Sequence, residues 1–300
     1  MLPMGEDEAS HRVPPWSTLR DMALTAEERG LDSVYLADHL LFRERSRTEG
    51  IHEAWTVLSA VAALTSRVEI GPLVLAAPFR NPAITAKMAA ELDEVSGGRL
   101  VLGLGCGWHE PEFEAFDLPF DHRVGRFEEA LEIMLPLVRE GHVRFEGRWH
   151  RADAELAPPG PRPEGMPVLI AGKGPRMLRL VARHADRWNA AWYGPPAMAD
   201  ELDARIARLR DACDAEGRDI ATMTLTAGVF VSFPALAREG DETPPDSAMR
   251  GTPEEVAPML AGYAGRGIGE LISHVWPNRP EAVAELAKAA ELARGLVAVQ

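Results

Sequence analysis

Apolar positions along the 300-residue chain follow two spacings, and the two spacings take turns in a regular order. Short, nearly continuous apolar runs, such as those at 33–43 and 67–77, are typical of buried strands. The longer stretches between them, such as 14–30, carry apolar residues at helical spacing. Proline opens and glycine closes several of these stretches, as Pro82 and Gly97 do, which is the usual punctuation of a helix.

The order of these elements predicts the fold class. If residues 1–4 are counted as the stub of a first strand, eight strands alternate with eight helices. Strict alternation predicts parallel strands joined by crossover helices, and eight such units in about 250–300 residues predict an α/β protein, a (β/α)8 TIM barrel. We therefore expect a single domain over residues 1–300. An open, doubly wound sheet is disfavoured, because the glycine-rich stretch GLGCGW follows the fourth strand rather than the first.

Two departures from the regular repeat are expected. Residues 142–166 hold Gly147 between two alternating, aromatic arms and end in a proline-rich run. This pattern predicts a hairpin and a loop inserted after the fourth helix. The first strand consists only of the four residues MLPM, so we expect it to be truncated.

Composition narrows the range of partners. Lys and Arg total 32 against 46 Asp and Glu, a formal net charge of −14, whereas nucleic-acid binding needs clustered cations. No apolar run is long enough to cross a bilayer, and the polar N-terminus does not resemble a secretory signal. Cys106 and Cys213 lie too far apart in sequence to form a disulfide or metal framework. These features predict a cytoplasmic protein that acts on a small molecule, and they leave open whether it is a homo-oligomer.

The first candidate site is the pair Asp38 and His39, which follows the apolar residues at 33–36. A buried charge is costly unless it is paired, so the strand ends either at a site or in a structural contact. Active sites of barrel enzymes lie at the C-terminal ends of the strands, and this position favours a catalytic pair. The structural alternative is that Asp38 caps a backbone turn and His39 packs beside it.

A second candidate site follows the apolar strand at 167–171. Glycines allow the backbone to approach a ligand, and the free N–H groups at a helix N-terminus favour an anion. The two cations in this stretch add positive charge to an acidic protein, so we predict a phosphate-binding turn; the alternative is an ordinary strand-to-helix turn. The residues concerned are Gly172, Lys173, Gly174, Pro175 and Arg176.

The stretch LGLGCGWHEPEF after the fourth strand predicts no metal site. His109, Glu110 and Glu112 lack the H-E-x-x-H spacing that would place two imidazoles on one helical face. Cys106 is interpreted as a small residue that fills a gap rather than as a nucleophile, because no helix terminus is present to lower its pKa. Trp108 either walls a pocket or packs in the core.

Pro72 lies inside a run that otherwise reads as a central strand. Because proline removes a donor from the strand ladder, its position predicts a bulge or local distortion. Irregular backbone at a barrel mouth often serves a ligand.

The order and spacing of five segments resemble the luciferase-like flavin-dependent monooxygenase superfamily, which includes bacterial luciferase, alkanesulfonate monooxygenase and the deazaflavin-dependent dehydrogenases. The resemblance runs from about Trp16 to Trp192. Its carriers are AEERGLDSVYLADHLL, LTSRVEIGPLVLAAPFRNPAITAKMAAELDEVSGGRLVLGLGCGWHEPEFEAF, RFEEALEIM, FEGRWHRADAEL and IAGKGPRMLRLVARHADRWN.

The resemblance implies a barrel with a flavin-type ring at its C-terminal mouth. Asp38 and His39 match the family's Asp-His pair, and Leu73-Val74 match a bulge under the ring that often contains a cis peptide bond. The turn at 172–176 matches the cofactor-phosphate turn. The cofactor-binding residues expected from this match are Leu73, Val74, Cys106, Gly172, Lys173, Gly174, Pro175 and Arg176.

The favoured hypothesis is a monooxygenase that uses reduced FMN and oxygen on a small organic substrate, with a separate flavin reductase as a partner. In it His39 transfers a proton and Asp38 fixes its tautomer. Alternatives are hydride transfer with an F420-type deazaflavin coenzyme, a non-catalytic flavin-binding relative and, least favoured, a metal-dependent hydrolase. In the deazaflavin-dependent sugar dehydrogenases a Trp and a Glu accompany the histidine, and Arg43 and Trp108 stand in those places here. This difference disfavours the sugar chemistry but not the deazaflavin.

Overall fold

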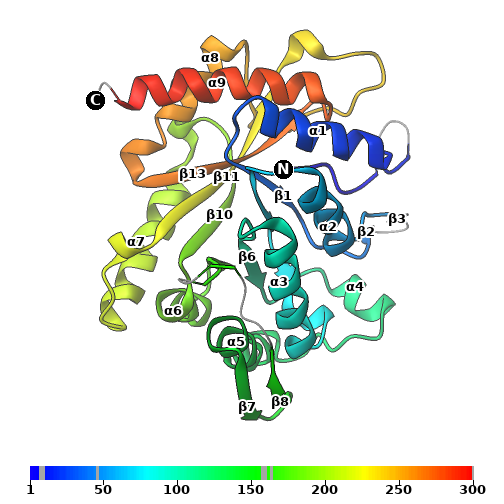
Figure 1. The fold of residues 1–300 in the computed structure, drawn as a ribbon. Coiled ribbons are helices and arrows are strands. Elements are labelled where there is room, and N and C mark those ends of the chain that lie inside the picture. The colour runs from blue at the N-terminus through cyan, green and yellow to red at the C-terminus, as the bar shows by residue number, and fades with distance from the viewer. Residues whose placement is uncertain (7–10, 45–46, 157–160, 163–164, 299–300) are drawn as a thin grey trace.

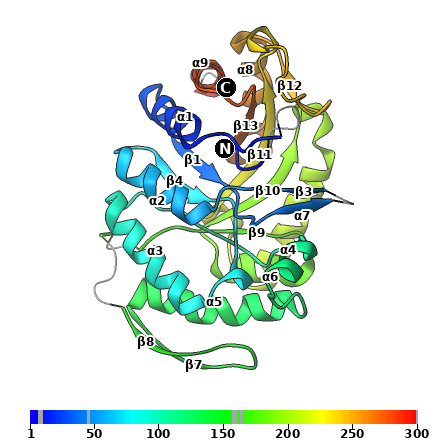
Figure 2. The same ribbon diagram turned by 90° about the vertical axis from the view of Figure 1, so that its right-hand side faces the viewer.

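Parallel strands form the wall of a barrel, and helices surround it in this computed structural model (Figures 1 and 2). The structure describes all residues except 7–10, 45–46, 157–160, 163–164 and 299–300. Neighbouring barrel strands pair in parallel and follow the order of the chain. They are β1 (Ser33–Leu36), β4 (Glu69–Pro72) continued by β5 (Leu75–Ala76), β6 (Leu102–Gly105), β9 (Val168–Ala171), β10 (Arg187–Tyr193), β11 (Thr224–Ser232) and β13 (Ile268–Trp276).

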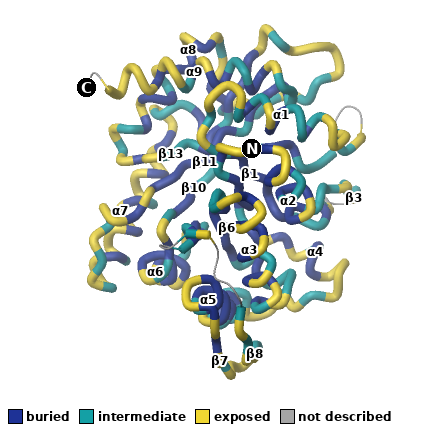
Figure 3. Tube along the Cα trace, viewed as in Figure 1, coloured by how far each residue is buried: buried dark blue, intermediate teal, exposed yellow. Residues whose placement is uncertain are grey.

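A helix connects each barrel strand to the next, and its apolar side is buried against the wall (Figure 3). The helix ends follow the sequence: Asn81 caps α3 by accepting hydrogen bonds from two backbone N–H groups, and Gly97 ends it in a left-handed conformation. The helices are α1 (Trp16–Glu28), α2 (Ala54–Leu64), α3 (Pro82–Ser96), α5 (Arg123–Glu140), α6 (Pro175–His184), α7 (Asp200–Ala215), α8 (Pro253–Ala261) and α9 (Pro280–Ala298), with a short α4 (Glu110–Ala115).

The predicted insertion is an antiparallel hairpin of β7 (His142–Glu146) and β8 (Arg151–Glu155), which projects beside α5 away from the barrel (Figure 2). The carboxylate of Glu129 accepts three backbone N–H groups at the tip of this hairpin. A second hairpin, β2 (Phe42–Glu44) with β3 (Arg47–Glu49), was not predicted. The apolar run at 33–43 is therefore one strand, a turn and the first arm of this hairpin. A two-residue strand, β12 (Met249–Arg250), pairs in parallel with the C-terminal end of β11.

A network of ionic groups lies at the N-terminal end of the barrel. The Arg187 guanidinium contacts Glu69 at 2.7 Å and Glu270 at 3.1 Å, and Ser33 donates to Glu270 at 2.7 Å. These contacts join β10, β4, β13 and β1. Burial raises the pKa of the Glu270 carboxyl. The barrel floor is thus held by paired polar groups rather than by apolar packing alone.

The fold class is confirmed, and the first strand is reduced to a contact of two residues. The Met1 amine donates to the Ser273 carbonyl and the Leu2 N–H to the Tyr35 carbonyl, each at 2.8 Å. Within the described part of the chain, no strand pairs with β1 and β13 between them. The same residues include no helix long and apolar enough to span a bilayer.

Candidate active site

A cavity of about 630 Å³ opens at the C-terminal ends of the strands. Residues that follow β1, β4, β6 and β9 line it together with residues of β10 itself, so the crossover topology brings together side chains that are far apart in sequence. His39, the Leu73–Val74 pair, Cys106 and Lys173 are all among the lining residues. The two candidate sites of the sequence therefore belong to one cavity.

His39 is held by a carboxylate that sequence reasoning did not pair with it. Its Nδ1 lies 2.8 Å from Oε1 of Glu112, and the Glu112 side chain is 1% exposed. The other oxygen of Glu112 accepts the N–H of Leu40 at 2.5 Å. A carboxylate only accepts hydrogen bonds, so Nδ1 of His39 donates to Glu112. In the neutral imidazole Nε2 is then the acceptor, in a residue that lines the cavity.

Aromatic rings surround His39. The Phe42 ring centroid lies 4.5 Å from the imidazole, and the Trp108 centroid lies 5.6 Å from it at a nearly perpendicular angle. Trp108 lines the cavity and is 62% exposed, so it walls the mouth rather than packing in the core. Such rings exclude water from one side of the imidazole.

The Asp38 carboxylate pairs with Arg80, and Nδ1 of His39 pairs with Glu112, so the prediction that Asp38 fixes the tautomer of His39 is wrong. Its buried carboxylate forms a two-pronged pair with Arg80, at 2.7 and 2.9 Å, and accepts the Ala76 N–H at 3.0 Å. Arg80 also contacts Glu53, whose carboxylate caps α2. Asp38 therefore has the structural role that was the alternative to catalysis in the sequence analysis. It also lines the cavity.

The distortion predicted from Pro72 is present. Leu73-Val74 is a cis peptide that separates β4 from β5. The adjacent strand fits this bulge because it carries glycine: a Cβ at Gly103 would lie 2.0 Å from the Pro72 carbonyl oxygen, and one at Gly105 would lie 2.7 Å from Val74. A second cis peptide, Ala191-Trp192, also lines the cavity and had no sequence indication.

The five residues of the predicted phosphate turn divide between two places. Gly172 and Lys173 line the cavity, and the Lys173 side chain is exposed. Gly174 is the N-cap of α6 and Pro175 its first residue, so the free N–H groups of the first turn lie beside Lys173. Arg176 instead pairs with Glu128 and lines a smaller hollow of about 290 Å³ at the start of α5.

Cys106 lines the cavity next to the bulge. Burial raises the pKa of its thiol, so the group is a protonated, weakly reactive side chain at neutral pH. In the part of the chain that the structure describes, no three His, Cys, Asp or Glu side chains are grouped closely enough to hold a metal ion.

Residues 1–242 match the family model for luciferase-like monooxygenases. The chain belongs to the luciferase-like monooxygenase family. It is 32% identical to the F420-dependent glucose-6-phosphate dehydrogenase of Amycolatopsis mediterranei, over 78% of this chain and 70% of that enzyme. It is 33% identical to the phthiodiolone/phenolphthiodiolone dimycocerosates ketoreductase of Mycobacterium tuberculosis H37Rv, over 72% of this chain and 61% of that protein. The protein is an oxidoreductase of this family.

Solved structures of other proteins share the fold. An F420-dependent secondary alcohol dehydrogenase in complex with an F420-acetone adduct superposes with a TM-score of 0.76, at 20% identity, over 94% of this chain and 96% of that one. The monooxygenase RslO1 from Streptomyces bottropensis superposes with a TM-score of 0.73, at 22% identity, over 92% and 94%. Both confirm the barrel and its alternating helices.

The position of Asp38 generates a test. Asp38→Asn keeps the shape but removes the charge that faces Arg80, so we expect it to lower the free energy of unfolding by about 2–4 kcal/mol. Denaturant unfolding measures this loss. Asp153→Asn, on the exposed hairpin, is the control and should leave stability unchanged. An Asp38→Asn protein with unchanged stability and a lowered rate would restore the catalytic interpretation.

Proposed function

We propose that the protein transfers a hydride between an F420-type deazaflavin coenzyme and a small organic alcohol or carbonyl compound. The observation that carries this proposal is the similarity to three proteins named F420-dependent glucose-6-phosphate dehydrogenases, which are 29–32% identical over 72–91% of the chain. These relatives favour the second hypothesis of the sequence over reduced FMN and oxygen.

The residues of the cavity fit a phosphate-bearing, planar cofactor. Leu73 and Val74 form a bulge in the cavity wall. The bulge leaves no room for a side chain at Gly103 or Gly105 in the adjacent strand. Lys173 and the first turn of α6 offer a cation and free N–H groups for a phosphate. We therefore assign the ring to Leu73, Val74 and Cys106, and the phosphate to Gly172, Lys173 and Gly174.

His39 is the acid–base group of the proposed reaction. A bound deazaflavin supplies or accepts the hydride. The Nε2 of His39 takes the hydroxyl proton as an alcohol becomes a carbonyl, and returns it in the reverse direction. Glu112 stabilises the imidazolium that forms and keeps the ring oriented. Phe42 and Trp108 keep water away from this proton.

A second candidate function is oxygenation with reduced FMN, which would need a separate flavin reductase. It is favoured by the similarity to the pyrimidine monooxygenase RutA of Pantoea ananatis, at 30% identity over 63% of this chain and 51% of that enzyme. The substrate is a separate matter. Trp108 stands where the sugar dehydrogenases have a glutamate, so we do not extend the proposal to glucose 6-phosphate.

Titration with F420 and with FMN tests the proposal. We expect the deazaflavin to bind more tightly and its reduced form to be reoxidised by a carbonyl substrate without consumption of oxygen. Absorbance and an oxygen electrode measure the two quantities. Tight binding of FMN together with substrate-dependent oxygen consumption would establish the second candidate instead.

Substitution of His39 tests the acid–base role. His39→Ala should lower turnover per folded molecule by about a hundredfold or more. It should leave cofactor affinity nearly unchanged, because the imidazole is a small part of the wall, but lower the melting temperature, because Glu112 stays buried without its partner. Glu112→Gln should lower turnover by about tenfold, since the imidazolium loses its negative partner. His142→Ala, on the exposed hairpin, is the control. Full turnover in His39→Ala would remove this residue from the mechanism.

Lys173→Ala tests the phosphate turn. The loss of one charge-assisted hydrogen bond should weaken cofactor binding by about 1–3 kcal/mol, measured by calorimetry. Arg179→Ala removes a cation from the exposed side of the same helix and should have no effect. Equal losses in both variants would indicate a general electrostatic effect rather than a phosphate contact.

A further inference from the structure

One wall of the candidate active-site cavity consists of aromatic rings that take no part in the proposed acid–base step. Trp192 of β10 and His274 of β13 line the cavity. Phe230 of β11 contacts the Trp192 ring, and Trp276 of β13 contacts the His274 ring. We call these four residues the aromatic wall. They lie on neighbouring strands, because β11 pairs with both β10 and β13.

The rings of the aromatic wall form two stacked pairs that touch each other. The centroids of Trp192 and Phe230 are 5.4 Å apart at an interplanar angle of 15°, and those of His274 and Trp276 are 4.1 Å apart at 14°. Phe230 also meets Trp276 edge-on, at 5.6 Å and 69°. Offset-stacked and edge-to-face contacts are favourable arrangements of aromatic rings. The four side chains therefore hold one another in place.

Gly228 of β11 leaves the space that the Trp192 ring fills. A Cβ at this position would lie 2.7 Å from Cε3 of Trp192 and 2.7 Å from the Cβ of Ala191. Because protein interiors are close-packed, any side chain here would displace the indole. Trp192 is nevertheless 37% exposed and lines the cavity. Part of its ring is therefore available to a bound molecule.

The aromatic wall carries no charge at neutral pH. Burial lowers the pKa of the His274 imidazole to about 3, although the nearby Asn278 side chain acts in the opposite direction. Arg205 of α7 also lines the cavity, but its guanidinium pairs with Glu201 and donates to the Ala191 carbonyl at 3.3 Å. An anionic group would meet no unpaired cation among the described residues of this wall, which therefore favours an uncharged ligand.

The proposed position of the cofactor leaves this side of the cavity to the substrate. The residues assigned to the deazaflavin ring and its phosphate belong to the segments after β4, β6 and β9. His39 follows β1, and the aromatic wall belongs to β10, β11 and β13. A substrate whose hydroxyl donates to Nε2 of His39 can therefore pack the rest of its skeleton against the aromatic wall.

We propose that the substrate is an uncharged alcohol with an aromatic ring, or the matching carbonyl compound, and that Trp192 is the residue that selects it. This inference rests on the proposed hydride transfer and adds the class of the substrate to it. The ring of the substrate stacks on the exposed part of the indole, while its hydroxyl group donates to Nε2 of His39. A sugar phosphate is disfavoured, because the aromatic wall offers its charge no partner.

Two alcohols that differ in one group test the substrate class. 1-Phenylethanol carries a phenyl group where 2-propanol carries a methyl group. With oxidised F420 as the hydride acceptor, kcat/KM should be at least about thirtyfold higher for 1-phenylethanol, because its phenyl ring buries more apolar surface and stacks on the wall. The absorbance of F420 measures both rates. Glucose 6-phosphate should be oxidised more slowly than 1-phenylethanol.

Substitution of Trp192 tests its role in selection. Trp192→Ala should lower the ratio of the two kcat/KM values by about tenfold, and Trp192→Phe should keep it within about threefold, since phenylalanine still offers a ring. The matched control is Trp16→Ala, which removes an indole of similar exposure, 36%, from a residue outside the cavity lining. This control should leave the ratio unchanged. The ratio is independent of the fraction of protein that is folded.

Binding without the cofactor separates this inference from the proposed function. If no alcohol reduces F420, the hydride transfer is wrong, and the binding of 1-phenylethanol to the cofactor-free protein then decides about the aromatic wall. The protein should broaden the phenyl proton resonances of 1-phenylethanol. This broadening should be at least about fivefold weaker with Trp192→Ala than with Trp16→Ala.

The other outcomes overturn the proposal. A kcat/KM ratio near one, or a ratio that Trp192→Ala leaves unchanged, would mean that the aromatic wall does not select the substrate. Faster oxidation of glucose 6-phosphate than of 1-phenylethanol would mean that the substrate is charged. Equal broadening with Trp192→Ala and Trp16→Ala would mean that the phenyl ring binds elsewhere.

Discussion

The buried pair of Asp38 and Arg80 fixes the mouth of the barrel. Asp38 comes from the end of β1 and also accepts the N–H of Ala76 in β5. Arg80 extends the contact to Glu53, the cap of α2. The segment after β1, the strand β5 and the start of α2 are therefore joined through Asp38, Arg80 and Glu53. A buried charge of this kind is strongly destabilising if its partner is lost, so the geometry of the cavity depends on the pair.

In this arrangement one carboxylate supports the fold and a different carboxylate orients the proposed acid–base residue. Because Asp38 is occupied by Arg80, a different carboxylate holds His39, and Glu112 comes from the helix that follows β6. Glu112 thus fixes the orientation of His39, and the pair of Asp38 and Arg80 fixes the rim of the cavity. Neighbouring residues in the sequence, Asp38 and His39, have different tasks because their side chains bond to different partners, Arg80 and Glu112.

Much of the fold could be predicted from the sequence because alternation is a local property. Proline and glycine marked the helix ends, and Pro72 marked the break in β4. The partners of Asp38 and His39 could not be predicted, because Arg80 and Glu112 lie 42 and 73 positions away in the chain. Arg176 was misplaced for a related reason: its charge is directed to Glu128 on another helix. Spacing indicates which residues share an end of the barrel, but not which of them touch.

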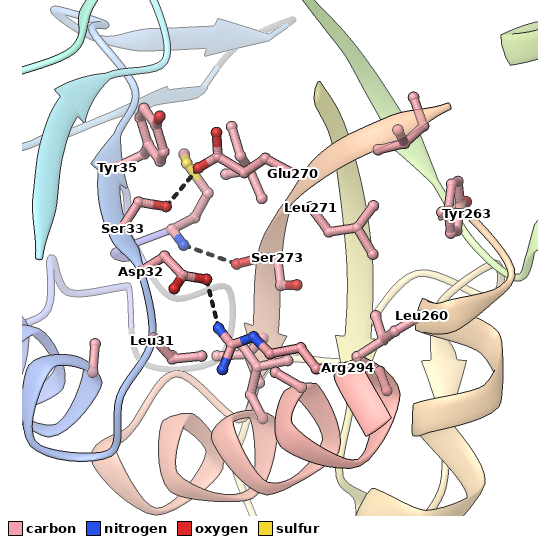
Figure 4. Close-up of a pocket in the computed structure, with 18 of the residues that line it drawn as sticks. Leu31, Asp32, Ser33, Tyr35, Leu260, Tyr263, Glu270, Leu271, Ser273 and Arg294 are labelled. Carbon is pink, nitrogen blue, oxygen red and sulfur yellow. Dashed lines mark hydrogen bonds and ion pairs between the residues drawn. The ribbon is translucent and has the colours of Figure 1, made fainter. Parts of the chain in front are cut away.

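Two cavities of the barrel share Met1 and Leu2 as part of their walls. One is the cavity of about 450 Å³ between β1 and β13 (Figure 4), and the other is the cavity around His39. Motion of Met1 and Leu2 therefore changes the shape of both spaces at once.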